Sequence, residues 1–314
     1  MRPLAFLLLL PGLVLAQELH TFENGQVADA EKINENFQAL ADGLGTLSSV
    51  PTIGGLDNGY IEVDCSVNAD ALSNVMFSEA ALRINSMTVF VLAGNCNYPG
   101  NQWLRSRSVG LIAAEQGMEL IFTTEQKFLN IKNGDLYLEG FTLRDVQTIS
   151  LFQQASLQVA SVSFKHSSEM FPPRINVRSN SLLRISEAFE SVEPFVRPSI
   201  YATNSEVRIL NVDTTAVMGT IDLALNSTFW CRFCRLDAEA LKLDTNSSFC
   251  GFVESLDGNP EELGIQSLSV KAGSVFLHDW APTSPPSYPA TVDEDAFAVW
   301  DNASPAYSTR CFQR

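Results

Sequence analysis

Hydrophobic and polar residues alternate within a short motif that recurs through the middle of the chain. The clearest copies begin with Asn-Ser: Asn180-Ser181-Leu182-Leu183-Arg184-Ile185, Asn204-Ser205-Glu206-Val207-Arg208-Ile209 and Asn226-Ser227-Thr228-Phe229-Trp230-Cys231. Looser copies begin at Asn133, Gln154, Asn246 and Ala272. Successive copies are about 23 residues apart, a spacing typical of solenoids, in which each repeat forms one turn of a stacked array.

The alternation predicts which side chains face the interior, because successive residues of a strand point to opposite faces. The expected inward residues of the first strand are Leu136, Leu138, Leu157, Val159, Leu183, Ile185, Val207, Ile209, Phe229 and Cys231. After a bend, further inward pairs follow: Phe141 and Leu143, Val162 and Phe164, Val212 and Thr214, and Cys234 and Leu236. Two short strands per turn predict an all-β parallel β-helix rather than a leucine-rich repeat.

The asparagine that opens the motif is expected to lie at one bend of every turn. These asparagines are Asn133, Asn180, Asn204, Asn226 and Asn246. Stacked parallel strands can carry Asn ladders, in which each side-chain amide bonds to the next. We therefore expect a structural role for the asparagines.

Upstream of the repeats, residues 1–16 have the pattern of a secretory signal peptide. Arg2 precedes an apolar run from Leu4 to Leu15, and the segment ends in the small residue Ala16. The apolar run is too short to span a bilayer, and no later run reaches the length of a membrane-spanning helix. The chain is therefore expected to be exported without a membrane span.

Residues 17–49 are predicted to form an amphipathic helix, and residues 50–59 a linker. Apolar residues recur at steps of three and four: Val27, Ala30, Ile33, Phe37, Leu40, Leu44 and Leu47. Such a narrow stripe is the seam of a short coiled coil, in which a polar Asn34 would select the register. Two alternatives remain open: a homo-oligomer such as a trimer, or a single helix folded against the solenoid.

Residues 60–280 are assigned to the β-helix. It opens with a strand at Ile61 to Val63 that ends at Cys65, a helix after Asp70, and a strand from Met87 to Ala93 closed by Gly94-Asn95-Cys96. The helix is expected to cover the open end of the array, where the strand edge is otherwise unpaired. The proline-rich segment 281–314 is expected to cover the other end.

Two parts of this pattern resemble known proteins. The strand, Cys65, helix, strand and Gly-x-Cys sequence resembles the opening of right-handed parallel β-helix proteins of the pectin-lyase-like superfold. Phe22-Glu23-Asn24-Gly25-Gln26-Val27-Ala28-Asp29-Ala30, followed by Ile33-Asn34-Glu35-Asn36-Phe37, resembles the segment after the signal in bacterial secreted fibre-like proteins. The resemblance implies a right-handed, single-stranded β-helix with an N-terminal stalk. It also implies export to the periplasm, surface or surroundings of a Gram-negative bacterium.

Six cysteines in an exported chain allow three disulfides, since oxidised pairs persist outside the cytosol. The expected pairs are Cys65 with Cys96, Cys231 with Cys250, and Cys234 with Cys311. A redox role for Cys231-Arg232-Phe233-Cys234 is the alternative, although the βαβ context of such motifs is absent.

The net charge of the chain and its sequence motifs argue against several classes of function. The chain has 36 acidic and 20 basic residues, a net charge of −16, and loss of Arg2 with the signal peptide makes it −17. Nucleic acid and anionic membranes are therefore not expected partners. His20, His166 and His278 lack metal-ligand spacing, and no nucleophile elbow is present. No metal, cofactor or catalytic residue is predicted.

An enzyme on this fold needs carboxylates that act together as acid and base. The candidates are Asp145, Asp213, Asp237 and Asp244, but Arg235 occupies the slot equivalent to Asp213, so no stack of acids is expected. The Asp-Asp and Gly-His-Gly signatures of polygalacturonase-like enzymes are also missing. A polysaccharide lyase or glycoside hydrolase remains the alternative function.

The outward positions of the motif define the candidate binding residues. They are Tyr137, Gln158, Arg184, Arg208, Trp230 and, at the far end, Phe276. In one row they would form a strip that stacks on sugar rings and holds carboxylates or sulfates. Ordinary strand surface residues are the other explanation. The sequence thus predicts a non-catalytic, exported structural or glycan-binding protein, similar in role to an adhesin.

Overall fold

The structure is a computed structural model that describes most of the chain from residue 60 to residue 299. The described residues are 60–77, 88–98, 100, 102–123, 125, 127–167, 172–193, 196–212, 215–232, 234–252, 263–278 and 289–299. The predicted signal peptide, N-terminal helix and linker, and the tail apart from residues 289–299, lie outside them.

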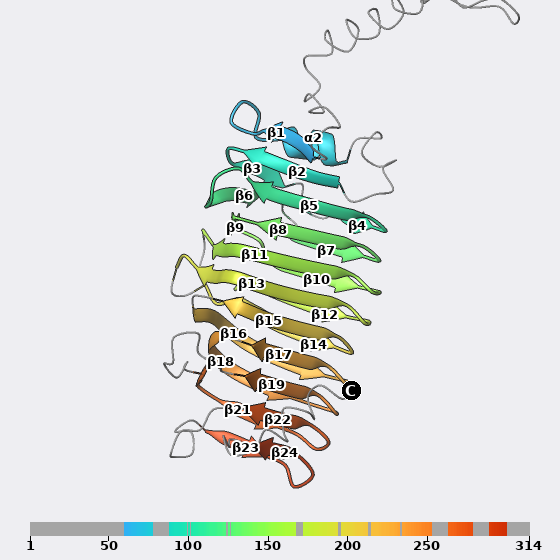
Figure 1. Cartoon of the computed structure of the whole chain (residues 1–314), viewed down its shortest axis with the longest axis vertical. Coiled ribbons are helices and arrows are strands. Elements are labelled where there is room, and N and C mark those ends of the chain that lie inside the picture. The colour runs from blue at the N-terminus through green and yellow to red at the C-terminus, as the bar shows by residue number, and fades with distance from the viewer. Residues whose placement is uncertain are drawn as a thin grey trace, which may run out of the picture. The chain divides into compact units, whose positions relative to one another are not determined.

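The chain forms a parallel β-solenoid of about 7 turns between residues 88 and 292. Figure 1 shows the turns stacked on one another, with β1 and α2 at one end and β23 and β24 at the other. The stacking order in the first sheet is β1 (Tyr60–Asp64), β2 (Thr88–Ala93), β5 (Ser108–Ala113), β8 (Asp135–Glu139), β11 (Ser156–Lys165), β13 (Leu182–Ser191), β15 (Glu206–Val212), β17 (Thr228–Arg232), β19 (Ser248–Phe252), β22 (Val275–His278) and β24 (Phe297–Val299).

A shorter stack joins the first sheet through the long strand β11. It contains β3 (Cys96–Tyr98), β6 (Met118–Phe122) and β9 (Phe141–Arg144). The second sheet contains β4 (Trp103–Arg105), β7 (Phe128–Lys132), β10 (Thr148–Phe152), β12 (Arg174–Arg178), β14 (Ser199–Thr203), β16 (Thr215–Ala224), β18 (Arg235–Leu243), β21 (Leu268–Val270) and β23 (Ala290–Val292), and β20 (Leu263–Ile265) pairs with β18. Both β23 and β24 fall in the segment assigned to the tail, yet they pair with β21 and β22.

The expected helix is present as α2 (Ala71–Met76), which buries Leu72 and Met76 completely. The predicted disulfide between Cys65 and Cys96 is confirmed, and it joins the end of β1 to the start of β3. Asp70 does not cap the helix through its side chain. Its carboxylate instead accepts a hydrogen bond of 2.9 Å from the Asn97 side chain, which lies on β3.

The predicted inward residues of the first strands are confirmed. Each of them, from Leu136 to Cys231, is at most 2% exposed, and the second inward pairs are also buried wherever their side chains are described. Near the end of the array the core contains a stack of Phe229, Phe249 and Phe276, with neighbouring ring centroids 5.2 Å apart.

Phe276 was predicted to face outward, and this prediction is wrong. It pairs in register with Phe249 and is fully buried. The last copy of the motif begins at Gly273 and not, as the sequence alignment suggested, at Ala272. Gly273 is equivalent to the asparagine of the other copies, and Ser274 is equivalent to the serine. Gly273 has the positive φ of 75° that this bend requires, and Ser274 is 1% exposed, like the preceding buried serines.

The asparagines act mainly through their backbone. Asn133, Asn180, Asn204, Asn226 and Asn246 all have φ between 48° and 61°, the left-handed region that asparagine tolerates better than other side-chain-bearing residues. The expected continuous ladder of amides is wrong, since the only side-chain bond among these five described residues joins Asn204 to Asn180 at 2.9 Å. In three of the bends the preceding residue (Ser179, Leu225 or Thr245) is left-handed too, so the bends differ in shape.

In three of the bends, the serine after the asparagine makes the same hydrogen bond inside the turn. The hydroxyls of Ser181, Ser227 and Ser247 donate to the carbonyl oxygens three residues earlier, at 2.5, 2.6 and 2.6 Å. These serines are at most 2% exposed, and a buried polar group is costly unless it is hydrogen-bonded. The Asn-Ser pair therefore combines a left-handed turn residue with an internal hydrogen bond.

The other two predicted disulfides are wrong. Cys231 pairs with Cys234, across a Cα separation of 5.7 Å, and both side chains are buried. The register places Cys231 opposite Gly251 and Cys250 opposite Trp230, so Cys231 and Cys250 point to opposite faces of the sheet. Cys250 is also disulfide-bonded, to a partner that the described residues do not include.

The bend predicts a difference between two substitutions of Asn204. Asn204→Ala loses the bond to Asn180 and forces a Cβ-bearing residue without a local hydrogen bond into the left-handed region, at a cost of about 1–2 kcal/mol. Asn204→Gly loses the bond but tolerates this φ, so we expect it to be about 1 kcal/mol more stable than the alanine variant. Urea unfolding measures both. A glycine variant as unstable as the alanine variant would contradict this role of the asparagine.

Candidate functional site

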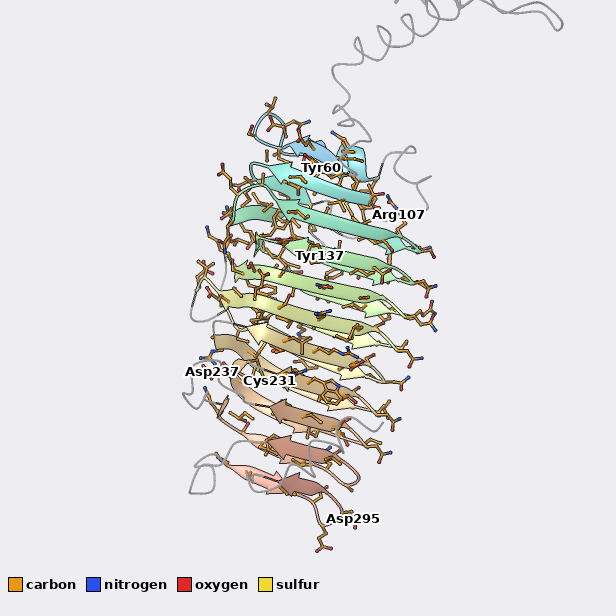
Figure 2. The ribbon with its side chains drawn as sticks, in the orientation of Figure 1. Tyr60, Arg107, Tyr137, Cys231, Asp237 and Asp295 are labelled. Carbon is orange, nitrogen blue, oxygen red and sulfur yellow. A yellow bond between two sulfur atoms is a disulfide. The ribbon has the colours of Figure 1, made fainter. Side chains whose placement is uncertain are left out.

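The first sheet brings the predicted binding residues into one row. Tyr137 pairs with Gln158, Gln158 with Arg184, Arg184 with Arg208, and Arg208 with Trp230, from β8 to β17. We call these five residues the strip. Neighbouring strands are about 4.8 Å apart, so the strip crosses the strands along the direction of stacking. Figure 2 labels Tyr137 on this stack of strands.

Two side chains of the strip already have partners within the molecule. The Arg208 guanidinium donates a hydrogen bond of 2.7 Å to Glu206, which raises the pKa of Arg208. The Tyr137 hydroxyl donates to Glu139 at 2.7 Å. Burial and this bond raise the pKa of Tyr137, so its hydroxyl stays protonated as a donor to Glu139.

Arg184 lies at the centre of the strip and is exposed. Among the residues that the structure describes, it makes no ion pair. Gln158, the neighbour of Arg184 on one side, is half-buried. Trp230, which lies on the other side beyond Arg208, is also half-buried. A guanidinium holds a carboxylate through two parallel hydrogen bonds, and an indole ring offers a flat apolar surface with a polar edge. This arrangement suits a ligand that combines a sugar ring with an acidic group.

The charges around the strip balance one another. In the strip and its two flanking rows, the basic side chains are Arg184, Arg208 and Arg232, and the acidic ones are Asp135, Glu139 and Glu206. A balanced surface attracts a highly charged polymer weakly. Selectivity at the strip would therefore come from local contacts with Arg184 and Trp230 rather than from a long-range field.

The candidate catalytic acids do not come together. Asp237 lies 3.4 Å from Arg197, Asp244 lies 3.0 Å from Lys271, and Asp145 follows β9 in a different part of the turn. Figure 2 labels Asp237 at the edge of the stack, away from Tyr137. Asp213 lies outside the described residues, and so does the side chain of Arg235.

A network of charged residues that sequence reasoning missed lies beside β9. Glu119 accepts hydrogen bonds from Lys165 at 2.7 Å and from Arg144 at 2.9 Å, so three consecutive turns are joined. The bond from Lys165 contributes most to lowering the pKa of Glu119, and Arg144 lowers it further despite burial. Glu119 is thus held as a carboxylate and is a poor general acid.

Asp145 belongs to the same network. Burial raises its pKa, but hydrogen bonds from the backbone and hydroxyl of Ser167, at 2.7 and 2.9 Å, and the charge of Lys127 lower it overall. His166, which directly follows β11, is buried, with its Nδ1 atom 3.6 Å from Asp145. The sequence contains one clue to this network: Arg144 and Lys165 are both basic and are paired on neighbouring strands. This clue can be recognised only when the register of the two strands is known.

Comparisons with known proteins give no relative from which a function could be inferred, so a proposal must start from the fold and the geometry of the surface. No protein-family model matches the chain, and no curated protein or solved structure is significantly similar to it. Within the described ranges, no group of three or more histidine, cysteine, aspartate or glutamate side chains is placed to hold a metal ion. The same part of the chain has no helix long and apolar enough to cross a membrane. The chain is a parallel β-solenoid.

The network around Glu119 predicts a pH-dependent contribution to stability. Glu119→Gln should lower the free energy of unfolding by roughly 1–2 kcal/mol at pH 7, because two charge-assisted bonds are lost from partly exposed partners. Since the folded-state pKa of Glu119 is lowered, the wild type has this stability above the ordinary glutamate pKa and loses it as the pH falls through the folded-state value.

Urea unfolding of both proteins between pH 3 and 7 measures the difference. The exposed Glu115, changed to Gln, is the matched control and should have little effect. A stability difference between wild type and Glu119→Gln that stays constant over this range would contradict the assignment.

Proposed function

We propose that this protein is an exported, non-catalytic β-helix that binds glycans through the strip, as a structural or adhesin-like module. The observation that carries the proposal is Arg184, an exposed guanidinium in register between Gln158 and Arg208, with Trp230 one strand beyond. Gln158 to Trp230 covers three strand intervals, about 14 Å, which suits a short stretch of sugar chain lying across the strands.

The finer features belong to the same proposal. The β-helix is right-handed and single-stranded, like those of the pectin-lyase-like superfold. The N-terminal segment forms a stalk that joins copies into a homo-oligomer such as a trimer. The protein is exported through its signal peptide and acts in the periplasm, on the surface or outside a Gram-negative bacterium. The sequence pattern from Ile61 to Cys96 supports the first of these features, and the patterns of residues 1–49 support the stalk and the export.

The described carboxylates favour binding over catalysis. A glycosidase needs one carboxyl group that keeps a proton and another placed across the scissile bond. Three of the described acids are instead engaged with basic partners: Asp237 with Arg197, Asp244 with Lys271, and Glu119 with Arg144 and Lys165. No observation therefore favours the lyase or hydrolase alternative.

Retention of the protein in gels that contain an acidic polysaccharide tests the strip. The double variant Arg184→Ala with Arg208→Ala should weaken retention at least tenfold, equivalent to about 1.4 kcal/mol. Arg184→Ala alone should cause most of the loss, because Glu206 already compensates the charge of Arg208. The control, Lys242→Ala with Lys271→Ala, removes the same charge from the second sheet.

Unchanged retention and an unchanged melting temperature in the strip variant would remove the proposal. The same polymer, incubated with the protein with and without Ca²⁺, should yield no unsaturated or reducing-end product. Formation of such a product would show that the protein is an enzyme.

A further inference from the structure

The second sheet has an outward row that combines cations with aromatic rings. Arg105 of β4 pairs with Lys132 of β7, and Lys132 pairs with Phe152 of β10. Arg178 of β12 follows next, because Val177 pairs with Leu151. Trp103 of β4 lies beside this row. We call these five residues the cationic patch.

Each guanidinium of the patch lies over an aromatic ring, within the range of a cation–π interaction. Arg105 lies 5.7 Å from the centroid of Trp103, and Arg178 lies 5.9 Å from that of Phe152. The two rings are 5.8 Å apart and form one aromatic base. A contact of this kind holds a cation in place and leaves the N–H edge of the guanidinium free to bind.

The cations of the patch are not neutralised within the described part of the molecule. Arg105 and Arg178 are exposed and Lys132 is half-buried, and none of the three forms an ion pair with a described residue. Several other described cations are paired with acids, namely Lys127, Arg144, Lys165, Arg197 and Lys271. In a chain of net charge −16, such a group of uncompensated cations is a local exception.

We propose that the cationic patch binds the carboxylate or sulfate groups of an acidic polysaccharide. Its cations are spread over three strand intervals, about 14 Å, so several acidic groups of one polymer can be bound together. The preorganised guanidinium groups lose little conformational entropy when they bind an anion. The patch is on a different sheet from the strip, and the inference does not rest on sugar binding by the strip.

Two other classes of polyanion fit the patch less well. Single-stranded nucleic acids bind by stacking bases on exposed aromatic rings, but here both rings are half-buried and a guanidinium lies over each of them. Stable binding to a membrane surface combines basic residues with apolar groups that insert between the lipids. The large apolar side chains that the structure shows exposed are Val67, Val192, Leu225 and Val292, none of which belongs to the patch.

Chromatography of the full chain on immobilised dextran sulfate, with unmodified dextran as the matched neutral polymer, tests the inference. The wild type should be retained at low salt on dextran sulfate only. Arg105→Gln with Arg178→Gln should weaken binding at least tenfold, with an unchanged melting temperature. Lys242→Gln with Lys271→Gln removes the same charge further along the second sheet and should leave retention intact. Competition by polygalacturonate or by free dextran sulfate shows which acidic group is preferred.

Several results would overturn the inference. Failure of the wild type to bind, or an equal loss of binding in both double variants, would each contradict it. Stronger competition by single-stranded DNA or by phosphatidylglycerol vesicles than by either polysaccharide would assign the patch to another class of ligand. Retention lost with Arg184→Ala and Arg208→Ala but kept with Arg105→Gln and Arg178→Gln would reject the patch while supporting the strip. Retention lost with Arg105→Gln and Arg178→Gln but kept with Arg184→Ala and Arg208→Ala would instead support the patch and count against the strip.

Discussion

A residue in the left-handed conformation lies two positions before every strand of the first sheet from β5 to β22, and these bends control how the turns of the solenoid stack. Asn180, Asn204, Asn226 and Asn246 reverse the chain at equivalent points, and the buried serine after each of them ties the bend from within. Since each strand then starts from an equivalent position, equivalent side chains fall into register along the stack. A shift by one residue would exchange the inward and outward faces of a strand.

Register explains why the surface is organised in rows with different properties. On the first sheet, the strip combines Arg184 and Trp230 with neighbouring acids, so its charges balance. On the second sheet, Arg105, Lys132 and Arg178 lie among aromatic rings without acidic partners in the described residues. The two rows thus offer one surface that depends on local contacts and another that depends on uncompensated charge.

The sequence predicted the features that a local rule controls. Alternation identified the inward residues and the strip, because the distance from the asparagine to the outward residue is constant in the clear copies. When Asn246 is aligned with Asn226, Cys250 is equivalent to Trp230 and not to Cys231. The predicted Cys231–Cys250 disulfide disagreed with this alignment. The Glu119 network and the cationic patch could not be predicted, since variable loops set the register of those strands and their residues do not repeat.

The row of outward side chains depends on the register of the first sheet, which a pair of introduced cysteines can measure. Arg184→Cys with Arg208→Cys places the two Cα atoms about 4.8 Å apart, within the range of a disulfide. Arg184→Cys with Leu210→Cys is diagonal, at about 7–8 Å, and should not be bridged. Alkylation under native conditions followed by intact mass measurement detects the new bond. A bridge in the first protein and free thiols in the second agree with the register, and the opposite result would contradict it.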